Sequence, residues 1–154
     1  MTSQFPTPPA DATRLLLVLD APIGAAEAEA LEALVAGYSP VLVGAEEDSG
    51  VAARLARHVG APLQANMPLG GGSGDAGSVL AVVRSMLAAH AKACIVVVAS
   101  EAVLRPLLCE ALGVPLAAAW RFRVEAGAVS VVEVGSDGRW ALVRLNERGD
   151  PPAG

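Results

Sequence analysis

The feature that most constrains the fold of this chain is the segment 93–115. It contains a short apolar run rich in β-branched residues, Cys-Ile-Val-Val-Val-Ala at 94–99, which is typical of a strand buried on both faces of a parallel sheet. Two polar residues, Ser100 and Glu101, break the run, and an apolar-periodic helical pattern follows that closes on a glycine and a proline. The segment therefore predicts a strand, a sharp turn and a helix. Ligands of open α/β sheets bind at such turns, so Ser100 and Glu101 mark a candidate site.

The composition agrees with an α/β core made of small side chains. The chain has 154 residues, 53% of them hydrophobic, only 3% aromatic, and a net charge of −5. No uninterrupted apolar run approaches the roughly 20 residues of a membrane span. The acidic balance argues against a general affinity for nucleic acids or anionic membranes. We therefore expect a protein with neither a nucleic-acid nor a membrane partner.

The two cysteines and the two ends of the chain bear on its location and domain organisation. Cys94 and Cys109 lie in apolar segments, so we expect both to be buried free thiols. Free thiols are typical of a reducing compartment, which predicts a cytoplasmic protein. The first residues hold three prolines and lack the charged and apolar regions of a signal peptide. We expect flexible tails at 1–12 and 148–154 around a single α/β domain at 13–147.

The remaining elements follow from short apolar runs, helical periodicity and turn residues. Strands are expected at 14–19, 41–43, 61–66, 120–124, 128–134 and 140–145, and further helices at 24–35, 46–59 and 79–91. Gly37 and Gly60 are expected to end their helices. The last two strands flank a Gly-Ser-Asp-Gly turn and predict an antiparallel hairpin. The predicted fold is a three-layer α/β/α sandwich with a mostly parallel sheet and an antiparallel C-terminal hairpin.

A glycine-rich loop invites a nucleotide-binding interpretation. The segment 72–77 matches G-x-G-x-x-G and precedes a helix, with Asp75 or Ser78 able to cap it. A strong strand does not precede it, however, and no lysine follows the glycines, which excludes a Walker phosphate loop. A plain connection is the favoured interpretation, and a nucleotide site is kept as an alternative.

Other residue types that carry chemistry are sparse. His58 and His90 each fall near the end of an expected helix, where a histidine interacts favourably with the helix C-terminus. His58 has no cysteine or histidine three or four residues away, and the one such neighbour of His90 is Cys94, which belongs to the apolar run of the expected strand. The sequence therefore predicts no metal site and no cofactor. Ser100 lacks the G-x-S-x-G setting of a nucleophile and is expected to cap a helix.

The order of elements and several motifs resemble the phosphoglycerate-mutase-like branch of the histidine phosphatase superfamily. Residues 96–108 stand where the family has Val-Val-Ser-His-Gly-Gly, an apolar residue, Ile and Arg, and 111–115 stand for its Leu-Gly-Leu-Pro. The strand at 15–21 resembles the family's opening strand, which ends Val-Arg-His-Gly-Glu. The resemblance implies the family's fold, shortened by the loss of its long insertions.

The family's functional residues do not carry over. Its first arginine falls on Leu19, its phosphorylated histidine on Asp20, its second arginine near Ser49 and its second histidine on Ser100. Phosphoryl transfer through histidine needs an imidazole nucleophile and cationic donors for the phosphate oxygens. The resemblance therefore implies a catalytically degenerate protein with a binding or assembly role.

Three further expectations remain. Asp20 and Glu101 would act as an acid/base or cation-binding pair in a divergent hydrolase or phosphatase if their carboxylates converge. The alanine-rich helix faces around 25–33 and 81–91 suit close packing, either within the chain or against a second copy in a homodimer. The partner is otherwise expected to be a small molecule or a protein that the sequence does not name.

Overall fold

The structure of the protein is a computed structural model, which describes residues 12–46, 49–65 and 76–149. Four helices cover a six-stranded sheet from both sides within these ranges. The strands are β1 (Thr13–Leu19), β2 (Leu42–Ala45), β3 (Leu63–Gln64), β4 (Cys94–Ala99), β5 (Val129–Val134) and β6 (Trp140–Glu147). The helices are α1 (Ala25–Gly37), α2 (Gly50–Val59), α3 (Ala76–Ala89) and α4 (Glu101–Leu112), with a 3-10 helix at Leu116–Arg121.

The sheet is mostly parallel, as the sequence predicts. Its order is β3-β2-β4-β1-β5-β6, and the first four strands in that order run parallel to one another. β5 pairs antiparallel with β1, and β6 pairs antiparallel with β5. The expected C-terminal hairpin is thus confirmed, and it extends one edge of the parallel sheet.

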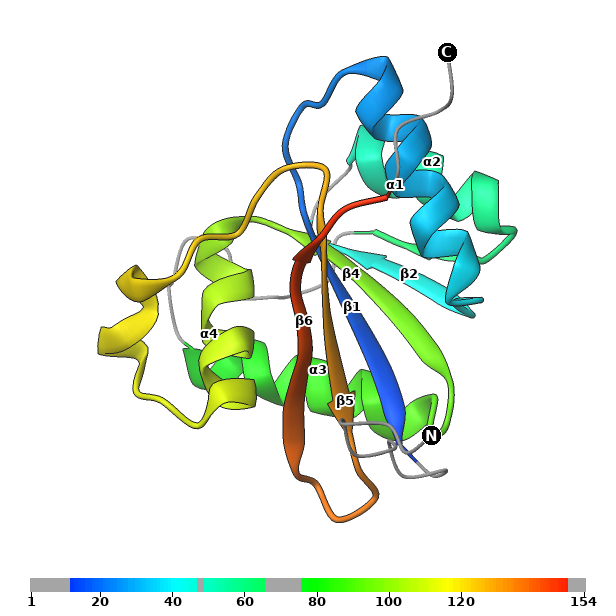
Figure 1. Cartoon of the computed structure of the whole chain (residues 1–154). Helices are drawn as coiled ribbons and strands as arrows, with labels where there is room; N and C mark the ends of the chain where they lie inside the picture. Colours follow the sequence, from blue (N-terminus) through cyan, green and yellow to red (C-terminus); the bar gives the residue numbers. More distant parts are fainter. Residues whose placement is uncertain (1–11, 47–48, 66–75, 150–154) are drawn as a thin grey trace, which may run out of the picture.

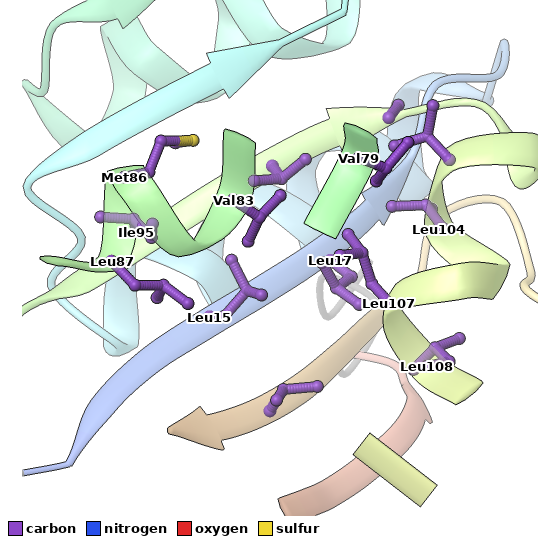
Figure 2. Packing of buried hydrophobic residues seen from close by; sticks show 14 of the residues in the cluster. Leu15, Leu17, Val79, Val83, Met86, Leu87, Ile95, Leu104, Leu107 and Leu108 are labelled. Carbon is purple, nitrogen blue, oxygen red and sulfur yellow. The ribbon is translucent and has the colours of Figure 1, made fainter. Parts of the chain in front are cut away.

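Two apolar cores, one on each face of the sheet, hold the layers together. The helices that cover these cores lie on opposite sides of the sheet (Figure 1). α1 and α2 cover one face, where Leu16 and Val18 of β1 meet Leu31 of α1 and Leu55 of α2. α3 and α4 cover the other face. Figure 2 shows Leu15 and Leu17 of β1 against side chains of α3 and α4; the labelled helical residues are Val79, Val83, Met86, Leu87, Leu104, Leu107 and Leu108. Successive residues of β1 thus serve opposite cores, because strand side chains alternate between faces.

The prediction of a strand at 120–124 is wrong. The stretch 120–124 forms no strand: residues up to Arg121 close the 3-10 helix, and Phe122 to Val124 run as a loop. The apolar positions alternate with arginines as in a strand, but β6 already occupies the sheet edge beside β5. Phe122 and Val124 still pack into the core under α4, whereas Trp120 is 73% exposed.

The helix ends confirm two of the three predicted caps. Gly60 and Gly113 follow α2 and α4 with φ of 72° and 70°, the left-handed conformation that glycine adopts at low cost. Gly37, by contrast, is the last residue of α1, and Ser39 takes the positive φ instead. The short strand expected at 61–66 is reduced to Leu63–Gln64 at the other sheet edge.

The ends of the chain and the glycine-rich loop are described only in part. Segments 1–11 and 150–154, and the loop from 66 to 75 with its nucleotide-binding pattern, lie outside the described residues. Arg148 and Gly149 are described, and Gly149 lies so close to α1 that a Cβ added there would meet the Ala30 carbonyl oxygen at 2.5 Å. None of the described helices is long and apolar enough to cross a membrane.

Candidate functional site

The candidate site lies where β1, β2 and β4 end. Because these strands run parallel, the residues that follow them meet at one edge of the sheet. Asp20 follows β1, Glu46 follows β2 and Ser100 follows β4. Backbone hydrogen bonds extend the pairing one step past the strands: Asp20 N donates to Ala99 O at 2.9 Å, and Glu46 N donates to Val98 O at 3.3 Å.

Asp20 and Ser49 are brought together across 29 residues of sequence. The Ser49 hydroxyl donates to Asp20 Oδ1 at 2.8 Å and accepts a hydrogen bond from Ala52 N at 3.1 Å. Ser49 is thus the N-cap of α2, and it is buried with 8% of its surface exposed. The Ser49 hydroxyl thus accepts a hydrogen bond from the first turn of α2 and donates one to Asp20. The second of these bonds fixes the direction of the Asp20 side chain.

Glu46 fills a role that the sequence did not reveal. It was expected to open the helix that follows β2, but α2 begins only at Gly50, and Glu46 lies before its cap. Its carboxylate instead accepts a hydrogen bond from the backbone N–H of Ser100 at 3.3 Å. A backbone donor beside the start of α4 is therefore occupied by a carboxylate of the chain itself. Neither periodicity nor composition signals this contact, because Glu46 and Ser100 are 54 residues apart in sequence and follow two different strands.

Ser100 and Glu101 begin α4 as expected. Ser100 is the N-cap residue in extended conformation, although its side chain makes no capping hydrogen bond. Glu101 lies in the first turn, where its negative charge suits the helix dipole. Its carboxylate forms an ion pair with Arg105 one turn later, at 2.6 Å. The i,i+4 spacing of these two residues is a sequence signal for this pair.

Arg105 joins α4 to the 3-10 helix. Its Nη1 donates to the carbonyl oxygen of Ala119 at 3.5 Å, while its Nε is buried without a hydrogen-bond partner. The side chain is 30% exposed, so its aliphatic part packs within the protein. Among the described residues no arginine pairs with Asp20 or Glu46.

Leu19, His58 and His90, the other residues considered in the sequence analysis, lie within or beside helices and strands. Leu19 ends β1 and packs, partly buried, against the core beneath α3 and α4. His58 lies in the last turn of α2, 3.7 Å from Glu32, and His90 directly follows α3. Within the described ranges no three His, Cys, Asp or Glu side chains gather as metal ligands would.

Both cysteines are buried, as expected from their apolar neighbours. Cys94 and Cys109 are free thiols with 7% and 4% of their surface exposed. Burial raises the pKa of Cys94 to about 11 against the lowering effect of Arg14, and burial also raises the pKa of Cys109. Both thiols therefore stay protonated and unreactive at neutral pH.

Asp20 and Glu101, the suggested catalytic pair, are engaged with different partners. Asp20 is bound by Ser49, and Glu101 is bound by Arg105. The contacts that converge on the strand ends come instead from Asp20, Glu46, Ser49 and Ser100. The site therefore offers two carboxylates that are already hydrogen-bonded within the chain.

Comparison with known proteins relates the C-terminal half of the chain to a known superfamily. A model of the histidine phosphatase superfamily (branch 1) matches residues 76–148. Searching the curated proteins finds no match.

Solved structures share the fold over nearly the whole chain. One called "Mycobacterial hydrolase 1" is 13% identical, with 90% of this chain and 100% of that one covered and a TM-score of 0.73. The alpha-ribazole phosphatase of Shigella flexneri is 19% identical over 92% of this chain and 100% of its own, with a TM-score of 0.62. The phosphoserine phosphatase of Entamoeba histolytica, solved with 3-phosphoglyceric acid, is 10% identical over 88% and 97%, with a TM-score of 0.71.

Proposed function

We propose that this chain, which belongs to the histidine phosphatase superfamily, does not transfer phosphoryl groups and acts by binding a small molecule or a protein partner, in the cytoplasm. The observation that carries the proposal is the Glu46 carboxylate on the backbone N–H of Ser100. The Glu46 carboxylate already accepts the Ser100 N–H at the start of α4, so a phosphate would have to displace this carboxylate to bind the same donor.

The charge of the strand ends supports the same conclusion. Asp20 and Glu46 both follow strands at this edge of the sheet, and no guanidinium pairs with either among the described residues. Two unit charges of like sign repel by about 4 kcal/mol at 4 Å in an effective dielectric of 20. A phosphate dianion carries more than one charge and meets two carboxylates, so binding would be strongly unfavourable without cationic donors.

The sequence offers no replacement for the missing chemistry. Leu19, Ser49 and Ser100 stand where the family resemblance places an arginine, an arginine and a histidine. A leucine has no hydrogen-bonding group, and the Ser49 hydroxyl is committed to the helix cap and to Asp20. Asp20 stands where the resemblance places the phosphorylated histidine, and its carboxylate would have to attack phosphorus from an acidic neighbourhood.

Hydrolysis of p-nitrophenyl phosphate between pH 5 and 9 tests the proposal. We expect no release of nitrophenol above the buffer rate for the wild-type protein, and the same for Asp20→Asn. Turnover by the wild type that disappears in Asp20→Asn would overturn the proposal and support the divergent hydrolase instead. Because Asn keeps the size and one acceptor oxygen of Asp20, its hydrogen bond with Ser49 and the fold are retained.

A further inference from the structure

A groove between α1 and α2 has the composition of a ligand site. It has a volume of about 360 Å³, within the range of roughly 300–1,000 Å³ typical of small-molecule sites. Ile23, Leu31, Val51 and Leu55 supply its apolar lining. Its lining residues come from α1, α2 and the loop before α1, and Figure 1 shows that these two helices lie on the same side of the sheet. The lining residues Pro22 and Gly50 are near neighbours in sequence of Asp20 and Ser49.

Three charged side chains also line the groove, and their charges do not cancel. These are Glu32 of α1 and Arg54 and Arg57 of α2. Arg54 Nε forms an ion pair with Glu32 at 2.8 Å, and the Glu32 side chain is only 14% exposed. Arg57 has no ion-pair partner among the described residues. The lining therefore carries one net positive charge, in a chain whose net charge is −5.

The ion pair holds Arg54 in place without using up its hydrogen-bonding capacity. A guanidinium carries five N–H donors, and Glu32 is engaged at Nε. Arg54 and Arg57 are separated by three positions on α2, so their side chains project from neighbouring places on one helix face. Together they offer forked donors beside an apolar surface, the combination that recognises a carboxylate attached to a hydrocarbon body.

We propose that this groove binds a small apolar carboxylic acid as its monoanion, with the carboxylate at Arg54 and Arg57 and the hydrocarbon against Ile23 and Val51. One negative charge on the ligand matches the one unbalanced positive charge of the lining. The inference rests on the proposed binding function and names the chemical class of the ligand. It places that ligand beside the strand ends and not at the acidic edge itself.

Sodium octanoate is the probe that tests the groove. The chain contains two isoleucines, Ile23 in the groove and Ile95 buried in β4. In methyl-labelled protein, octanoate is expected to shift the Ile23 signal in a saturable manner and to leave Ile95 in place. Calorimetric titration is expected to give one site per chain, with 1-octanol binding at least tenfold more weakly.

Variants separate the groove from other surfaces. Arg54→Gln and Arg57→Gln are each expected to weaken octanoate binding about tenfold or more, because each removes charge-assisted donors. Arg123→Gln, at an exposed arginine outside the groove, is the matched control and is expected to bind normally. Ala53→Leu fills the groove without changing charge and is expected to abolish binding.

The outcomes distinguish this inference from the proposed function. A shift of Ile23 that is absent, equal binding by the arginine variants, or tighter binding of octyl phosphate than of octanoate would each overturn the groove proposal. None of these results bears on phosphoryl transfer. Conversely, turnover of p-nitrophenyl phosphate that depends on Asp20, with octanoate binding intact, would overturn only the proposed loss of catalysis.

Discussion

The Ser49 hydroxyl lies 2.8 Å from Asp20 Oδ1 and ties the end of β1 to the first turn of α2. In the same place it accepts the Ala52 N–H, so the helix cap and the carboxylate depend on a single oxygen. Ser49→Ala removes both contacts within a buried position.

We expect Ser49→Ala to lower the free energy of unfolding by about 1–2 kcal/mol, the usual range for a lost N-cap with an additional unpaired acceptor. Urea denaturation measures the change. Ser49→Thr keeps the hydroxyl and is expected to retain most of the stability, and Ser85→Ala on the exposed face of α3 is expected to change it by less than about 0.5 kcal/mol. Equal stability of Ser49→Ala and wild type would contradict the double role of the hydroxyl.

The two ion pairs of α4 are expected to contribute unequally. Arg105 is 30% exposed and contacts both Glu101 and the 3-10 helix, whereas Arg84 of α3 is 54% exposed and forms an ion pair with Glu110. Arg105→Met is expected to destabilise the protein by about 1–2 kcal/mol, since a half-buried bridge and its packing are lost. Arg84→Met is the matched control and is expected to cost at most about 1 kcal/mol, as exposed pairs do.

Denaturation of both variants under identical conditions provides the comparison. If Arg84→Met proves as harmful as Arg105→Met, the contact between Arg105 and Ala119 O contributes nothing measurable.

Tyr38 links α1 to the end of β6 and titrates at unusually high pH. Its hydroxyl donates to Glu147 Oε1 at 2.5 Å, and burial together with this carboxylate raises the pKa of Tyr38 from 10.0 to about 12. Tyr38 is the only tyrosine of the chain, so absorbance at 295 nm reports its phenolate alone. We expect a midpoint near 12 in the folded protein and near 10 in concentrated urea.

The raised pKa also sets the sign of a stability change. The protonated phenol is favoured by the folded state, so its contribution is fully present below pH 10 and is lost as the pH rises from about 10 to 12. Tyr38→Phe is expected to remove this part of the pH dependence while leaving the contributions of other groups. A folded-state midpoint near 10 would show that the contact with Glu147 does not persist in solution.

The two thiols are expected to resist modification in the native protein. Burial raises the pKa of Cys94 to about 11 and also raises the pKa of Cys109, so the reactive thiolate is scarce at pH 8. Ellman's reagent at pH 8 is expected to react slowly with the folded chain and with two thiols per chain in guanidinium chloride. Rapid reaction of one native thiol would place that cysteine at the surface.

The sequence alone determined most of the fold, because its signals are local. The apolar run at 94–99, the glycines at 60 and 113 and the Gly-Ser-Asp-Gly turn each act within a few residues of themselves, and they gave the parallel strands, helix ends and hairpin correctly. The segment 120–124 failed for the opposite reason. A strand needs a neighbour to pair with, and the sheet edge was already taken by β6.

Only the tertiary structure decided how the candidate site is used. Ser100 was identifiable from its place after a strand and before a helix, and Asp20 and Ser49 were singled out by the family resemblance. The hydrogen-bond partners of all three come from elsewhere in the chain. In the sequence, Glu46 looks like part of an acidic helix start. In the structure, the parallel strands bring its carboxylate to the N–H of Ser100, 54 residues away. Local propensity fixes which elements form, whereas the pairing of charges and donors across strand ends depends on distances that only packing sets.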